Sequence, residues 1–89
     1  MKHRYLEVTF RRGRPLAAYL YLDRKPGDTS ARTEKRDKGL VVDFAGDGRA
    51  IGVEITSPMQ ASLEDINQVL TSLDEKPLTA EEVRPLAAA

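Results

Sequence analysis

Residues 5–23 contain two segments in which apolar and polar side chains alternate, the pattern of half-buried strands. A break that contains glycine and proline separates the two segments, and neither residue continues a strand ladder easily. Pairing Leu6 with Leu20 and Phe10 with Leu16 aligns the apolar rows of both segments. The pattern therefore predicts a tight antiparallel hairpin.

The second of these segments, residues 16–23, is apolar on both faces. Leu20 and Leu22 lie on one face, and Tyr19 and Tyr21 lie on the other. A strand of this kind is typical of the interior of a sheet that is covered on both sides. We therefore expect a central strand whose tyrosine face is covered as well as its leucine face.

Residues 30–38 are almost wholly polar. Their position between strands favours a solvated strand over a charged helix. Charged side chains discourage further strand pairing, so this segment suits the edge of a sheet.

Residues 40–55 give the clearest local pattern, two alternating apolar runs joined by Asp47-Gly48. Asp-Gly is favoured in two-residue hairpin loops because both central residues need a positive φ. Closing the turn on Gly46 and Arg49 sets the register, because a slip of one residue would put Asp43 into the apolar row. The expected apolar pairs are Leu40–Ile55, Val42–Val53 and Phe44–Ile51.

The C-terminal part of the chain predicts one amphipathic helix at about residues 62–73. Ser62 is suited to the N-cap, and apolar residues recur at helical spacing to form one stripe. Thr79 and Glu82 have capping-box spacing, which predicts a short helical turn and a frayed tail within residues 79–89.

The chain is thus expected to form a single α+β domain over residues 1–89. The strands, all within residues 5–56, should form an antiparallel β-meander of four to five strands. The C-terminal helix should pack on one face of this sheet, because a helix of this length is marginally stable alone.

The amino-acid composition excludes several classes of function. The chain has 89 residues, no cysteine and a formal net charge of zero. The lack of cysteine excludes disulfides and thiolate chemistry and favours a cytoplasmic location. No apolar run is long enough to span a membrane, and we expect neither a membrane contact nor a cofactor.

The zero net charge conceals an asymmetry between the two halves of the chain. Residues 1–38 carry 11 Lys and Arg against 5 Asp and Glu, and residues 39–89 carry 3 against 9. The two halves either attract one another within the fold or leave a basic face ready for an acidic partner.

Carboxylates are the main candidates for catalytic or binding groups. The single histidine, His3, has no cysteine or obvious serine partner that it could activate as a nucleophile. The predicted register turns Asp43 and Glu54 away from the helix, and Glu34, Tyr19 and Tyr21 are expected on the same face. Such a cluster can support acid–base chemistry or a hard cation, but such residues are more often cross-strand partners. We therefore expect no catalytic residue and no metal.

Basic residues form a second candidate surface. With tyrosines nearby, they could contact a nucleic-acid backbone and stack on bases. A nucleic-acid-binding domain is usually basic overall, so the zero net charge disfavours this interpretation. The residues of this predicted basic patch are Arg11, Arg12, Arg14, Arg32, Lys35 and Arg36.

The order and spacing of several motifs resemble a small bacterial family catalogued as domain of unknown function 2283. The motifs are Ala18-Tyr19-Leu20-Tyr21-Leu22, a polar stretch with Thr33-Glu34, Leu40-Val41-Val42-Asp43-Phe44, Asp47-Gly48-Arg49 and Ile51-Gly52-Val53-Glu54-Ile55. The resemblance covers roughly residues 5–70 and implies a single-domain bacterial protein with no established activity. It carries over Asp43, Gly48, Gly52 and Glu54 as motif positions, and an antitoxin-like role follows only by analogy.

The sequence therefore predicts a non-enzymatic protein-interaction module that homodimerises or binds another small protein. The half-apolar face of Ala17, Tyr19, Tyr21 and Val41 would make this contact. A nucleic-acid-binding or antitoxin-like regulator is the alternative. A small enzyme or cation site at Asp43 and Glu54 is the third interpretation.

Overall fold

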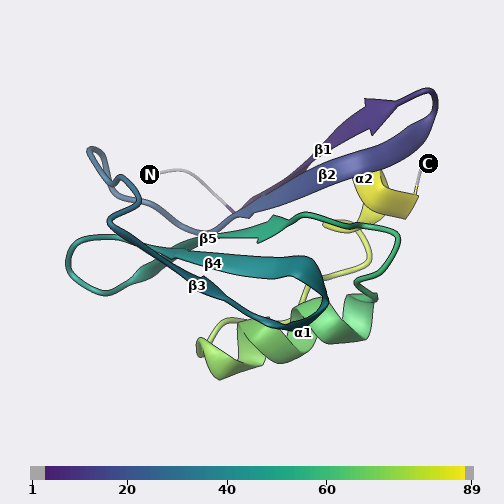
Figure 1. Cartoon of the computed structure of the whole chain (residues 1–89). Helices are drawn as coiled ribbons and strands as arrows, with labels where there is room; N and C mark the ends of the chain where they lie inside the picture. Colours follow the sequence, from purple (N-terminus) through teal and green to yellow (C-terminus); the bar gives the residue numbers. More distant parts are fainter. Residues whose placement is uncertain (1–3, 88–89) are drawn as a thin grey trace.

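The computed structural model describes residues 4–87, and His3 lies outside them. Five antiparallel strands form one sheet, and both helices lie on the same side of it (Figure 1). This α+β architecture confirms the predicted fold class. The elements are β1 Tyr5–Arg11, β2 Arg14–Tyr21, β3 Arg32–Lys35, a 3-10 turn η1 Asp37–Gly39, β4 Leu40–Phe44, β5 Ala50–Ile55, α1 Leu63–Ser72 and α2 Arg84–Ala87.

The strand order in the sheet is β1-β2-β5-β4-β3. β3, β4 and β5 follow one another as a meander, and the β1–β2 hairpin joins this meander at β5. The connection over residues 22–31 therefore carries the chain from β2 to the far edge of the sheet. Its Asp28 is held by Arg49, whose two terminal nitrogens donate to the carboxylate at 2.8 and 3.1 Å.

The β1–β2 hairpin has the predicted Leu6–Leu20 pair, but the predicted Phe10–Leu16 pair is wrong. Phe10 faces Pro15, and the register shifts between Thr9 and Phe10. The shift arises because the hairpin closes tightly on a two-residue turn, Arg12-Gly13, in which both φ angles are positive (53° and 77°). The extra residue in β2 is absorbed as a β-bulge.

The β4–β5 hairpin keeps the Leu40–Ile55 and Val42–Val53 pairs, whereas the predicted Phe44–Ile51 pair is wrong because Phe44 faces Ala50. The turn has three residues instead of two, since the Ala45 N–H donates to the Arg49 carbonyl at 2.8 Å. Only Gly48 in this turn has a positive φ (92°), as three-residue hairpin loops require. The longer turn displaces Ile51, which becomes the unpaired residue of a bulge.

β3 lies at the edge of the sheet, as its charge predicted. It pairs with β4 so that Glu34 faces Val42 and Thr33 faces Asp43. Glu34 therefore lies on the helix side of the sheet, and its predicted place beside Asp43 is wrong. Because side chains alternate along a strand, a one-residue difference in register reverses the face.

The hydrophobic core lies between the sheet and α1. Leu20, Val42, Val53 and Ile55 from the sheet meet the buried side of the helix, and each is fully buried. α1 begins with a capping box in which the Ser62 hydroxyl accepts from the Asp65 N–H at 3.0 Å and the Asp65 carboxylate accepts from the Ser62 N–H at 2.9 Å. The N-cap prediction is thus confirmed. Neither helix of residues 4–87 is long and apolar enough to cross a membrane.

The segment after α1 returns to the start of β1 and is held there by Arg4. Two nitrogens of its guanidinium donate to the two carboxylate oxygens of Glu82, both at 2.8 Å. The same group donates to the carbonyls of Lys76 at 2.7 Å and Pro77 at 3.1 Å. The predicted capping box is also present, since the Glu82 N–H donates to the Thr79 hydroxyl at 3.1 Å.

Replacing Glu82 by glutamine is expected to destabilise the protein at neutral pH by about 1.5–3 kcal/mol, because hydrogen bonds to charged groups contribute about that much. The hydrogen bonds from Arg4, opposed in part by burial, lower the pKa of Glu82 from 4.5 to about 2. A lowered pKa stabilises the fold above pH 4.5, and this contribution is lost as the pH falls towards 2.

The difference in unfolding free energy between wild type and Glu82→Gln should therefore shrink between pH 5 and pH 2, in the window set by this pKa. Urea denaturation at a series of pH values measures it. Glu81→Gln is the matched control, because Glu81 is exposed and forms no ion pair with the described residues. A difference that stayed constant with pH would contradict the proposed role of the Arg4–Glu82 pair.

Candidate functional site

The candidate site is the face of the sheet opposite the helices, here called the helix-free face. No helix among residues 4–87 covers it, although the sequence predicted cover on both sides of β2. Strand register arranges its side chains in two rows that cross all five strands. From β1 to β3, the first row is Tyr5, Tyr21, Gly52, Asp43 and Thr33, and the second is Glu7, Tyr19, Glu54, Val41 and Lys35.

Tyr19 lies across the middle of this face. Its hydroxyl donates to the Asp43 carboxylate at 2.6 Å and accepts from Arg24 at 3.0 Å. The ring passes directly over Gly52, where a Cβ atom would overlap the hydroxyl and the adjoining ring carbons. Gly52 is therefore a glycine because the Tyr19 ring occupies the position of its side chain.

Three tyrosines form an aromatic cluster along the first two strands. Tyr5 stacks on Tyr21 with ring centroids 4.6 Å apart, and Tyr19 meets Tyr21 edge to face at 4.7 Å. The Arg24 guanidinium lies 5.1 Å from the Tyr21 ring centroid and donates to the Ile51 carbonyl at 3.0 Å. Tyr5 remains 41% exposed, and the other two rings are half-buried. The cluster thus offers ordered aromatic surface to solvent.

Two phenols of this cluster, those of Tyr19 and Tyr21, are weaker acids than a free tyrosine. Burial, and then the hydrogen bond to Asp43, raises the pKa of Tyr19 well above its ordinary value of 10. Burial, with the nearby Glu7 carboxylate, also raises the pKa of Tyr21. Both hydroxyls therefore stay protonated at neutral pH and serve as hydrogen-bond donors.

Asp43 and Glu54 lie on the helix-free face, as predicted, but in different rows on neighbouring strands. Asp43 is engaged by Tyr19. Glu54 is exposed, and the carboxylate has no hydrogen-bond or ion-pair partner among residues 4–87. Within those residues there is no group of three or more His, Cys, Asp or Glu side chains arranged to hold a metal ion.

The predicted basic patch is divided between two distant places. Arg11, Arg12 and Arg14 lie at the turn of the β1–β2 hairpin, whereas Arg32, Lys35 and Arg36 belong to β3 and the residue after it, at the opposite edge of the sheet.

Most of the β3 group is engaged within the fold. Arg36 donates to Glu34 at 2.6 Å and to the Ser72 hydroxyl at 3.0 Å, which ties the sheet edge to α1. The Arg32 guanidinium lies 4.1 Å from the ring centroid of Phe44. The two groups therefore do not form a single basic surface.

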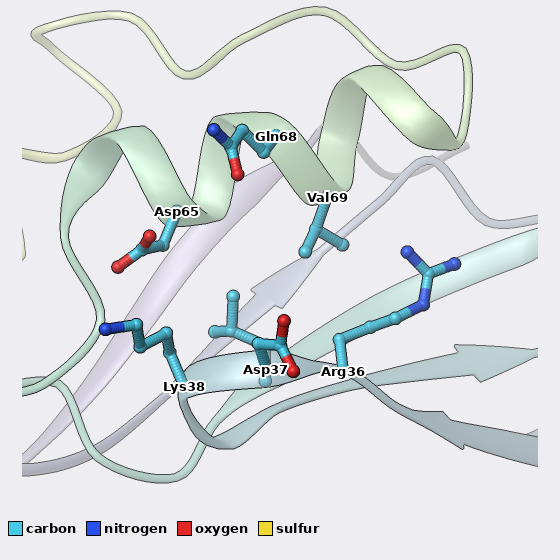
Figure 2. Close-up of a pocket in the computed structure, with 7 residues that line it drawn as sticks. Arg36, Asp37, Lys38, Asp65, Gln68 and Val69 are labelled. Carbon is cyan, nitrogen blue, oxygen red and sulfur yellow. The ribbon is translucent and has the colours of Figure 1, made fainter.

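A hollow of about 360 Å³ lies between α1 and the η1 turn (Figure 2). Arg36, Lys38 and Asp65 line it, together with Gln68 and Val69 of the helix. Two of its charged groups already have structural roles, since Asp65 caps α1 and Arg36 holds Glu34. We therefore assign no ligand to this hollow.

The sequence pattern predicted Tyr19, Tyr21, Asp43 and Glu54 as site residues, but it did not predict Tyr5 or Arg24. The Leu6–Leu20 pair already implies that Tyr5 faces Tyr21, so Tyr5 could have been found from the register. Arg24 follows the end of β2 in an irregular connection, and no sequence period places it over the tyrosines.

In comparisons with family models, curated proteins and solved structures, nothing matches the chain. The resemblance to the family of unknown function therefore stays an expectation. The function is therefore inferred from the site itself.

Proposed function

We propose that this protein is a small protein-interaction module that forms a homodimer through the helix-free face. The observation that carries the proposal is the aromatic cluster of Tyr5, Tyr19 and Tyr21, which is ordered by stacking yet has no covering element among residues 4–87. Aromatic side chains on an open sheet face are typical of interface cores. A β2 strand that is apolar on both faces is also more stable when both are covered.

The charges on this face favour a protein over a nucleic acid. Glu7, Asp43 and Glu54 supply three carboxylates, against the two cations of Arg24 and Lys35. A phosphate backbone would meet net repulsion here. The row that runs from Glu7 on β1 to Lys35 on β3 has opposite charges at its ends.

A second copy of the chain fits this charge pattern. A two-fold axis near β5 would bring Glu7 of each copy towards Lys35 of the other, as isologous interfaces require. The same axis brings the two Glu54 carboxylates together, which weakens the dimer. Neutralising this residue should therefore strengthen self-association, whereas neutralising Glu7 should weaken it.

Sedimentation equilibrium over a range of protein concentrations tests the proposal. We expect a reversible dimer, at least tenfold weaker dimerisation for the double variant Tyr5→Ser, Tyr21→Ser, and tighter dimerisation for Glu54→Gln. A tenfold change corresponds to about 1.4 kcal/mol, within the range measured for aromatic interface residues.

The matched control is Phe10→Ser with Leu16→Ser, which removes two exposed apolar side chains (43% and 53% exposed) from the end of the β1–β2 hairpin. It should leave the dimer unchanged. A wild-type protein that stays monomeric at millimolar concentration would refute the homodimer and leave another small protein as the partner to seek. The cysteine-free sequence supports placing this module in the cytoplasm.

A further inference from the structure

The β1–β2 hairpin extends beyond the rest of the sheet. Pairing between β2 and β5 begins at Ala18, so the residues nearer the turn have no neighbour on the β5 side. Figure 1 shows the hairpin projecting past the end of β5 as a two-stranded ribbon. We call residues 9–17 the arm.

The end of the arm is strongly basic. Arg11, Arg12 and Arg14 are all exposed, and none of their guanidinium groups forms a hydrogen bond or ion pair with another residue in the range 4–87. No Asp or Glu occurs between Glu7 and Asp23. Other arginines are engaged within the fold, among them Arg4 and Arg49. The arm therefore holds positive charge that the fold itself does not neutralise.

These arginines occupy positions where the local structure disfavours them. Arg12 has a φ of 53°, a left-handed conformation that Asn or Gly adopts at lower cost. Arg11 and Arg14 face one another as a cross-strand pair of like charge, which destabilises a ribbon. Residues that break such local structural preferences without forming a stabilising contact are characteristic of functional positions.

We propose that the arm binds duplex DNA by placing its arginines on the phosphate backbone. A two-stranded ribbon fits the DNA grooves, and Arg guanidinium groups bind phosphate oxygens in a bidentate manner. Phe10 and Leu16 lie behind the arginines and are exposed, so they can contact the groove wall once the tip is seated.

The order of residues along the arm disfavours a membrane as the partner. In a membrane-inserting hairpin the apolar residues lead and the charges stay at the headgroups. Here the leading end is Arg11 to Arg14, and the apolar side chains follow. The proposal is independent of the homodimer, because the arm lies at one end of the sheet and uses none of the tyrosines.

Fluorescence anisotropy of a labelled DNA duplex of about two helical turns tests the proposal with the full chain. Three phosphate contacts predict a log–log salt slope of about −2.7, so affinity should fall about 40-fold between 50 and 200 mM salt. The arm variant Arg11→Thr, Arg12→Asn, Arg14→Thr should bind at least about tenfold more weakly at 50 mM salt, with a slope near zero.

The matched control, Lys25→Thr, Arg32→Thr, Lys38→Asn, removes the same charge from exposed positions outside the arm. Lys38 has a positive φ of 63°, as Arg12 does in the arm, so each variant replaces one residue of left-handed backbone. The control should keep its affinity within about twofold. The arm variant should melt no lower than wild type, because Thr and Asn suit their positions, which separates lost binding from lost folding.

Equal loss of affinity in the two variants would overturn the proposal, because the binding would then follow total charge. The absence of duplex binding at 50 mM salt would also overturn it. So would arm-dependent binding to anionic phospholipid vesicles or to poly-glutamate when the duplex does not bind, since the partner would then be a membrane or an acidic protein.

Discussion

Replacing Leu70 by alanine is expected to lower the free energy of unfolding by about 2–5 kcal/mol. Leu70 is fully buried, and it belongs to the cluster in which α1 meets the sheet. The change removes buried apolar surface and leaves a cavity, because the closely packed side chains around it can move into the space only in part. A domain of this size has about 5–13 kcal/mol of stability in total, so the variant will be near the limit of folding.

Urea denaturation or thermal melting followed by circular dichroism measures this loss, and 1 kcal/mol corresponds to about 4–8 °C in this size range. Leu63→Ala is the matched control, because Leu63 begins the same helix but is 45% exposed. It should cost less than about 1 kcal/mol. Equal losses at both positions would mean that the helix does not dock on the sheet through its Leu70 side.

Replacing Gly52 by valine is expected to destabilise the protein by about 2–4 kcal/mol. The new side chain would occupy the space of the Tyr19 ring, which must then leave the face and give up its hydrogen bond to Asp43. The backbone at Gly52 does not have a positive φ, so this cost is steric and does not come from strain.

A double-mutant cycle isolates this steric conflict. Once Tyr19 is replaced by alanine, Gly52→Val should cost little, since valine suits a strand and the space is free. The coupling energy between the two positions should then be about 1–3 kcal/mol. Additive effects would show that the ring does not lie over the glycine.

The elements of this fold could be predicted from the sequence because each one carries its own periodic pattern. Leu40, Val42, Val53 and Ile55 alternate so regularly that the central part of their hairpin has one register. The capping residues of α1 are likewise specified locally. In these segments, local preference and long-range packing favour the same structure.

The errors occur where turn geometry decides the register. Asp47-Gly48 has the sequence of a two-residue loop, but the ladder closes on Ala45 and Arg49 instead. A bulge then separates Phe44 from Ile51, and a second bulge separates Phe10 from Leu16. Gly48 can supply the positive φ of either a two-residue or a three-residue loop, so the residues of the turn alone do not specify the register.

For the candidate site, the sequence could predict only which strand residues share a face, because that follows from strand alternation. Alternation placed Asp43 and Glu54 on one face, but it could not show that the Tyr19 ring covers Gly52 or that Arg24 joins the tyrosines. Those contacts depend on side-chain rotamers and on an irregular connection. The division of the basic residues between two edges likewise depends on strand order, which the sequence pattern leaves open.

The strand order also bears on the kinetics of folding. The sheet consists of two locally connected parts, β1–β2 and β3–β4–β5, and only the ladder between β2 and β5 joins them. Each part can form within its own stretch of chain, whereas pairing Tyr21 with Gly52 requires the closure of a long loop. The rate-limiting step should therefore be the pairing of β2 with β5. Leu20 and Val53 face each other in this ladder, so they should govern the folding rate more than residues in either turn do.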